Sequence, residues 1–176
     1  MKLHVKHIFS GLTLAQYGEL YFEESFNEYL CKGVNLSRNV KEKSLNGTSL
    51  RRVTTVSPDR EIPGPVAKVI KMDRLEYDEE LTYDTSAFKG TWKINVPGPL
   101  GSKFSAGGQF VFREVSGGVE RELWGEINVK VFGVGKMIET LIVTDVEKSY
   151  ETAAAQTSQY IRDIAALFAL SLQRDW

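Results

Sequence analysis

The chain has 176 residues, 42% of them hydrophobic and 26% charged, and its formal net charge is −1. This length predicts one domain over residues 1–176, and the near-zero charge provides no basic field that would favour nucleic acid as a partner. The single cysteine, Cys31, excludes an intrachain disulfide and a cysteine-rich metal site.

No uncharged stretch reaches the roughly 18 apolar positions of a membrane-spanning helix. The sequence does not begin with a hydrophobic segment followed by a cleavage site, so it does not predict secretion. We therefore expect no integral membrane segment, and a cytoplasmic or membrane-peripheral protein.

The first part of the chain predicts one strand and a pair of short helices. Lys2–Phe9 alternates apolar and polar residues, as a half-buried strand does. Leu14–Leu30 has helical spacing and is interrupted near Gly18, with Thr13 or a neighbour as the cap before it. Gly33 is a plausible helix stop.

From Val34 onward the period of the sequence changes to two, and about six strands are expected. Asn46-Gly47 predicts a hairpin turn between the first two of them. Pro58–Met72 contains three prolines and predicts a loop with one or two helical turns, which we expect to cover one end of the fold as a lid. The later strands are expected over Ser49–Ser57, Asp73–Ser86, Phe88–Val96, Gly107–Ser116 and Val119–Val131.

The last third of the chain, Lys136–Gln173, contains no proline and no glycine, and predicts one helix of roughly 50 Å or more at about 1.5 Å per residue. Apolar or small residues recur in it at steps of three and four, which defines one long stripe. Such a helix needs an extended apolar surface, and the strands before it supply one. The residues expected to face the sheet are Ile138, Leu141, Tyr150, Ala153 and Ile161.

The order of one strand, a helical pair, about six antiparallel strands and a long helix predicts an α+β domain with a meandering sheet. A sheet of about seven strands coils, so it can wrap around the C-terminal helix. Two stretches carry a resemblance to a known family: Leu3–Phe9 at the start, and the glycine-containing turn Phe132–Glu139 into the long helix.

With this order, the chain resembles the helix-grip fold of the START-like superfamily (SRPBCC), which includes Bet v 1-like plant proteins and polyketide cyclases. The resemblance covers essentially the whole chain and is closest to uncharacterised bacterial branches. A weaker similarity is to PRELI-type lipid-transfer domains. The resemblance implies an apolar cavity between the sheet and the long helix, and hence the binding or carriage of a lipid-like or aromatic small molecule.

Side chains of the strands, of the first helices and of the long helix are candidates to line such a cavity. Alanines on the helix leave room for a ligand, but they also allow close packing of helix and sheet. A core filled by aromatic side chains, in a domain that acts through protein contacts, therefore stays an alternative. The expected ligand-binding residues are His7, Tyr21, Phe26, Arg38, Tyr77, Glu79, Trp92, Ala153, Ala154 and Tyr160.

Charged residues in apolar strand registers provide a second clue. His7, Arg38, Glu79 and Arg121 each share a predicted strand face with apolar residues. Because an isolated buried charge costs several kcal/mol, we expect Arg38 to pair with Glu79 or to bind a carboxylate or phosphate of the ligand. A register slip of one residue would instead place these side chains in water.

No motif assigns a catalytic residue, a cofactor or a metal site. His4 and His7 point to opposite faces of their strand, so they cannot bind one metal ion together. An enzyme of the cyclase or dehydratase type is the alternative function, with His7, Glu79 or Tyr77 transferring protons inside the same cavity.

The end of the chain, Ile164–Trp176, is apolar on nearly all sides of its predicted helix. Only one side can face the sheet, so the other is expected to meet a partner. We expect a weak homodimer, since the segment lacks the lysine-rich face of helices that bind a membrane surface.

Overall fold

The computed structural model describes the backbone of residues 1–71 and 74–174 and their side chains, except those of residues 65, 69, 70 and 167–174. Its elements follow the predicted order of one strand, two short helices, six strands and a long helix. They are β1 (Lys2–Phe9), α1 (Leu14–Tyr21), α2 (Glu24–Gly33), β2 (Leu36–Asn46), β3 (Ser49–Pro58), α3 (Gly64–Ile70), β4 (Tyr77–Asp84), β5 (Lys89–Asn95), the 3-10 helix η1 (Gly98–Lys103), β6 (Phe104–Val115), β7 (Gly118–Val129) and α4 (Gly135–Arg174).

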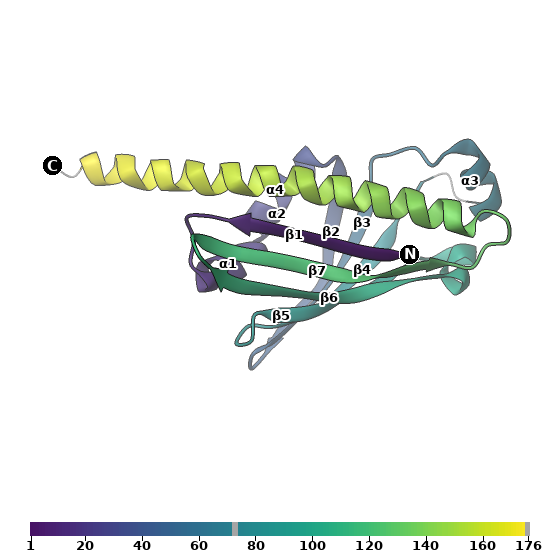
Figure 1. Ribbon diagram of the computed structural model, residues 1–176, viewed down its shortest axis with the longest axis horizontal. Coiled ribbons are helices and arrows are strands. Elements are labelled where there is room, and N and C mark those ends of the chain that lie inside the picture. The colour runs from purple at the N-terminus through teal and green to yellow at the C-terminus, as the bar shows by residue number, and fades with distance from the viewer. Residues whose placement is uncertain (72–73, 175–176) are drawn as a thin grey trace.

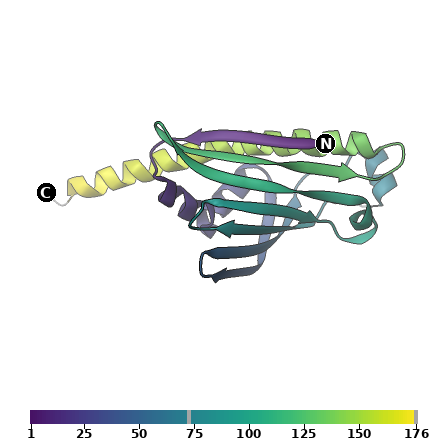
Figure 2. The ribbon, with the colours of Figure 1, turned by 60° about the horizontal axis from the view of Figure 1, so that its bottom comes forward.

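The seven strands form one antiparallel sheet in the order β1-β7-β6-β5-β4-β3-β2, so the first strand of the chain pairs with the last. Helix α4 lies along one face of this sheet, over β1 and β7, and also packs against α2 (Figure 1). The strands from β5 to β2 curve away from that contact (Figure 2). This is the predicted helix-grip arrangement, which the structure confirms.

Helix α4 begins and ends within one residue of the predicted bounds. Its first turn is fixed to the sheet, because Glu139 Oε1 accepts a 2.9 Å hydrogen bond from the backbone N–H of Val129. Its last turns extend beyond the edge of the sheet in both views (Figures 1 and 2). The predicted homodimer contact lies there, and its apolar side chains Phe168 and Leu172 fall outside the described residues.

The face of α4 that packs on the sheet differs from the prediction at one position. Leu141 is 43% exposed, whereas Val143 is buried. At about 100° per residue, Leu141 points almost opposite to the mean direction of the buried helix positions. Those positions are Ile138, Val143, Ala154, Thr157 and Ile161.

The break between the two short helices comes at Phe22-Glu23, so its prediction near Gly18 was wrong. Gly18 lies inside α1, where it is buried beneath the sheet residue Tyr83. The side-chain amide of Asn27 donates hydrogen bonds of 3.0 and 2.7 Å to the carbonyls of Tyr21 and Glu23. It thereby satisfies acceptors that the end of α1 exposes.

Three strand boundaries also differ from expectation. β4 begins at Tyr77, although a strand was predicted from Asp73, which lies outside the described residues. β6 begins at Phe104 and is preceded by η1, because prolines 97 and 99 cannot extend a strand pairing there. In β2 a bulge between Val40 and Glu42 reverses the faces of the residues after it.

The core has two parts. The larger part lies between α1, α4 and the strands, and Phe9, Tyr17, Phe110 and Phe112 form its aromatic centre. The smaller part surrounds Val66 of α3 at the N-terminal end of α4, so the predicted lid segment does cover one end of the helix–sheet interface. Of the helices described, none is both long and apolar enough to cross a bilayer.

Candidate functional site

The inner face of β2, β3 and β4, which faces α2 and α4, contains charged and hydroxyl groups among apolar side chains. Arg52 and Thr54 are buried on β3, and Glu79 of β4 stands opposite Thr54. The bulge in β2 brings Lys43 opposite Arg52 and thus onto the same face. A polar cluster therefore forms in the interior of the grip.

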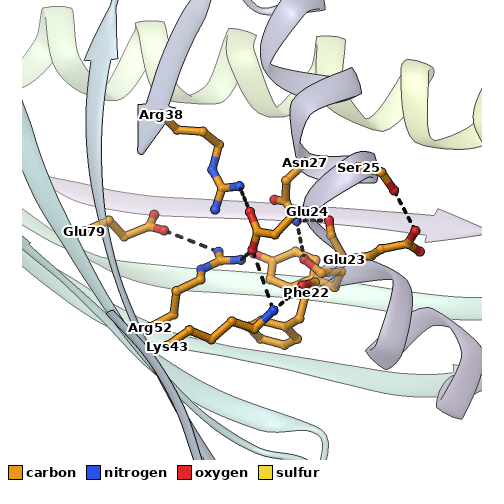
Figure 3. Close-up of polar contacts among 10 residues, drawn as sticks. Phe22, Glu23, Glu24, Ser25, Asn27, Arg38, Lys43, Arg52 and Glu79 are labelled. Atoms are coloured by element: carbon orange, nitrogen blue, oxygen red, sulfur yellow. Dashed lines mark hydrogen bonds and ion pairs between the residues drawn. The ribbon is translucent and has the colours of Figure 1, made fainter. Parts of the chain in front are cut away.

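Glu24, the first residue of α2, lies at the centre of this cluster (Figure 3). Its Oε2 atom accepts a hydrogen bond of 2.5 Å from Arg38 Nη1. Its Oε1 atom lies 3.7 Å from Lys43 Nζ and 4.0 Å from Arg52 Nη1. On the other side, Arg52 Nη2 lies 3.8 Å from Glu79 Oε1.

The predicted pairing of Arg38 with Glu79 is therefore wrong. β3 lies between the strands that hold the two residues, and strands are about 4.8 Å apart. The partner of Arg38 comes instead from α2, which packs on β2.

Several buried polar atoms of the cluster have no hydrogen-bond partner among the residues that the structure describes. They are Arg38 Nη2, Arg52 Nε and Nη1, Glu24 Oε1 and Thr54 Oγ1. Arg52 is 4% exposed, so bulk solvent does not reach most of its donors. Its ion pairs are longer than the roughly 2.7–3.2 Å of a hydrogen bond, and each unmet group costs about 1–3 kcal/mol. Among the residues that the structure describes, the unpartnered atoms thus include arginine N–H donors and, in Glu24 Oε1, one carboxylate acceptor.

Arg121 of β7 is a second buried cation, at 3% exposure. Its guanidinium carbon lies 5.2 Å from the ring centre of Phe9 and 5.0 Å from that of Tyr150, which stabilises the charge by cation–π attraction. Burial raises the pKa of Tyr17, and the positive charge of Arg121 opposes that rise. These contacts hold Arg121 in the aromatic part of the core.

His7 connects Arg121 to the surface. Arg121 Nη2 donates a 3.0 Å hydrogen bond to His7 Nδ1, because a guanidinium has no acceptor. The imidazole proton is then on Nε2, which donates a 2.9 Å hydrogen bond to Glu151 Oε1. Both ring nitrogens of His7 are therefore engaged.

Partly buried tyrosines adjoin the polar cluster. Burial raises the pKa of Tyr21, Tyr77 and Tyr150 above the ordinary value of 10.0, and the negative charge of Glu79 raises it further. These side chains stay neutral at physiological pH and act as hydroxyl groups. Glu79 stands opposite Thr54 of β3 and Ile94 of β5 in the sheet register, so it lies on the inner face of the sheet.

Some side chains on the facing surfaces of sheet and helix remain partly accessible to solvent. On the sheet these are Tyr77, Glu79 and Ile94, and on α4 they are Val146, Tyr150 and Ala153, whereas Ala154 is buried. The facing surfaces are thus not fully closed over β4 and β5. This region is where the structure brings together the largest share of the predicted ligand-binding residues.

The other predicted residues lie elsewhere. Phe26 is 1% exposed, and its ring centre is 5.0 Å from that of Tyr160, so the two join α2 to α4. Trp92 is buried over Gly125 and donates a 3.3 Å hydrogen bond to the carbonyl of Trp124. Tyr21 packs against Phe22, Phe110 and Phe112. His7 lies apart from the polar cluster, beside Arg121.

Sequence reasoning missed Glu24, Lys43 and Arg52. Arg52 alternates with Leu50, Thr54 and Val56, which is the same register signal that identified Arg38. Lys43 could not be found from alternation, since the β2 bulge reverses its face. The orientation of Glu24 depends on how α2 docks, which no local pattern encodes.

Two hollows formed by described residues lie on the outer face of the sheet, away from α4. One, of about 630 Å³, includes Lys93, Ser105 and Glu126, and the other, of about 550 Å³, includes Thr82, Thr91 and Gln109. Within the described part of the chain, no three His, Cys, Asp or Glu residues form a group that could hold a metal ion.

The sequence is similar to one described protein family. The family model "Protein of unknown function (DUF2505)" matches residues 6–161. No curated protein matches the sequence.

The fold is similar to solved structures of low sequence identity. The protein TTHA0849 from Thermus thermophilus has a TM-score of 0.64 at 13% identity, over 93% of this chain and 99% of that one. The Zhui aromatase/cyclase from Streptomyces sp. R1128 has a TM-score of 0.62 at 8% identity, over 92% and 94%. Ara h 8.0201 has a TM-score of 0.62 at 10% identity, over 93% and 98%. At these identities the likeness shows the fold alone.

Proposed function

The chain belongs to the DUF2505 family, and we propose that it is a START-like protein that binds a hydrophobic small molecule between the inner face of the sheet and α4. The helix-grip fold, which is typical of hydrophobic-ligand binding, supports this proposal. Lipid-like and aromatic molecules are the candidate ligands.

The observation that carries the proposal is the incomplete closure of the helix on the sheet. Val146 and Tyr150 of α4 and Ile94 of β5 pack against the core yet stay partly accessible. Apolar side chains that point inward and still meet solvent gain free energy when an apolar ligand covers them, by roughly 25 cal/mol per Å².

Binding without catalysis fits the polar groups better than the cyclase or dehydratase alternative. A general base must have a free site that accepts the proton of the substrate. His7 has both ring nitrogens engaged, by Arg121 and by Glu151. The raised pKa of Tyr77 keeps its hydroxyl neutral, which makes it a poor base.

Native mass spectrometry of the protein purified from its own host tests the proposal, with a copurified small molecule as the expected result. Val146→Trp should fill the ligand space and abolish copurification while the protein stays folded by circular dichroism. Thr144→Trp is the matched control, because Thr144 lies on the exposed side of α4. Wild-type protein that carries no ligand and binds no added apolar fluorophore would contradict the proposal and favour a filled core.

A further inference from the structure

We propose that the ligand carries an oxyanion, a carboxylate or a phosphate, which Arg38 and Arg52 bind in place of the Glu24 carboxylate. This inference rests on the proposed function and assigns the chemical class of its ligand. The cluster contains three cations, from Arg38, Lys43 and Arg52, against the two carboxylates of Glu24 and Glu79. The cluster therefore has one more positive than negative charge, and its Lys43 side chain is 39% exposed.

The unused donors have the geometry of an oxyanion site. Arg38 uses Nη1 for Glu24, and its Nη2 has no partner among the described residues. Arg52 reaches both carboxylates only at 3.8–4.0 Å and leaves Nε and Nη1 unpaired within the same part of the chain. Guanidinium groups bind carboxylate and phosphate through two parallel N–H donors, which neither arginine achieves with Glu24.

Glu24 is the member of the cluster that can leave. It is the first residue of α2, and its side chain is 40% exposed, whereas Arg52 is 4% exposed. Rotation into water would leave the carboxylate at the helix N-terminus, where the helix dipole still stabilises it. The side chains of Arg38 and Arg52 are only 9% and 4% exposed. An incoming oxyanion therefore replaces Glu24 rather than adding to it.

The cluster also borders the partly accessible apolar region. Glu79 pairs with Ile94 of β5 in the sheet register, and Ile94 packs against both parts of the core, which places the cluster beside the space between the sheet and α4. A ligand with its oxyanion at the arginines would direct its apolar part toward Val146 and Ile94. The inferred ligand is therefore an amphiphile and not a free anion.

Displacement of the neutral fluorophore N-phenyl-1-naphthylamine by three probes of equal chain length tests the inference. Dodecanoate and dodecyl phosphate should displace it at concentrations about tenfold or more below those of dodecanol, since hydrogen bonds to charged groups are the strong ones. Acetate and inorganic phosphate should not displace it at the same concentrations. Displacement by these free anions would overturn the amphiphile assignment.

Two variants with matched controls separate the roles of the residues. Arg52→Met should abolish the preference for dodecanoate, whereas Arg51→Met should keep it, because Arg51 pairs with Glu42 and Glu80 on the outer face. Glu24→Gln should bind dodecanoate several-fold more tightly and dodecanol equally, because the competing carboxylate is gone. Glu23→Gln is its control, since Glu23 contacts Ser25 outside the cluster (Figure 3).

The outcomes distinguish this inference from the proposed function. Equal binding of dodecanol and dodecanoate, or a preference that survives in folded Arg52→Met protein, overturns the oxyanion site and leaves hydrophobic binding intact. Failure of all three probes and of the fluorophore overturns both. If Arg52→Met does not fold, the comparison of Glu24→Gln with Glu23→Gln tests the inference instead. Equal affinities of these two variants for dodecanoate would show that the ligand oxyanion does not replace the Glu24 carboxylate.

Discussion

Replacement of Phe26 by alanine tests how α2 is held over the polar cluster. Phe26 is 1% exposed and is the buried side chain of this helix. Its ring centre lies 5.0 Å from that of Tyr160 on α4, at an angle of 57° between the ring planes. The contact joins the two helices, and Glu24 stands on the same helix only two residues earlier.

The expected loss follows from this burial. Removal of a fully buried phenylalanine side chain costs about 3–5 kcal/mol of unfolding free energy, because transfer and cavity terms add. For a chain of this size each kcal/mol corresponds to about 2–4 °C, so the midpoint of thermal unfolding should fall by about 6–20 °C. Circular dichroism during heating and during urea titration measures both quantities.

Tyr29→Ala is the matched control, because it removes another aromatic ring of α2 that faces Tyr160. Its ring centre is 5.1 Å from that of Tyr160, but Tyr29 is 37% exposed. Its removal should therefore cost only about 1 kcal/mol, close to the value of one aromatic pair. Equal losses for the two variants, or a loss below about 1 kcal/mol for Phe26→Ala, would refute the described docking of α2.

Three further predictions concern other parts of the chain. Gly125→Ala places a Cβ 2.3 Å from the Gly107 carbonyl oxygen and 2.5 Å from Trp92, so urea unfolding should show a loss of about 1–3 kcal/mol in the free energy of unfolding. The control Gly107→Ala should cost less, because its Cβ would stay at least 3.0 Å from its neighbours. A larger loss for Gly107→Ala than for Gly125→Ala would contradict this packing. Burial raises the pKa of Tyr83 from 10.0 to about 12, so its contribution to stability is complete below pH 10 and is lost as pH rises to about 12. The free energy of unfolding of Tyr83→Phe should therefore fall less between these two pH values than that of the wild type. The same pH dependence in both proteins would contradict the raised pKa of Tyr83. Sedimentation velocity should show a weak homodimer that Phe168→Glu and Leu172→Glu abolish, and a monomer at every concentration would end that expectation.

The fold was predictable because its main elements carry strong burial patterns. Alternation in Lys2–Phe9 and helical spacing in Lys136–Gln173 encode one buried face each, and the structure places both elements as expected. The break between α1 and α2 was not predictable from glycine alone. Gly18 lies inside α1 and packs closely under Tyr83, where a side chain would not fit. Glycine at this position therefore allows close packing and does not end the helix.

Residues of the candidate site were predictable only where a charged side chain interrupts the apolar face of a strand. Arg38 was identified because it interrupts an apolar face, and Arg52 carries the same signal on β3. Lys43 needed knowledge of the β2 bulge, and Glu24 needed the position of α2 on the sheet. Both depend on tertiary contacts between segments distant in the sequence. Local periodicity cannot report such contacts.

The interior differs between the region around α1 and the region around α2, and this difference determines which kind of ligand it can accept. Around α1, the inner surface is closed by stacked aromatic rings such as Tyr17 on Phe9, at 5.1 Å. Around α2, it contains arginine donors without partners among the described residues, and burial of such groups is unfavourable unless something pairs with them. A wholly apolar ligand would cover these donors and leave them unpaired. An amphiphile with an oxyanion pairs these donors while its apolar part covers Val146 and Ile94, so the interior around α2 favours this class of molecule.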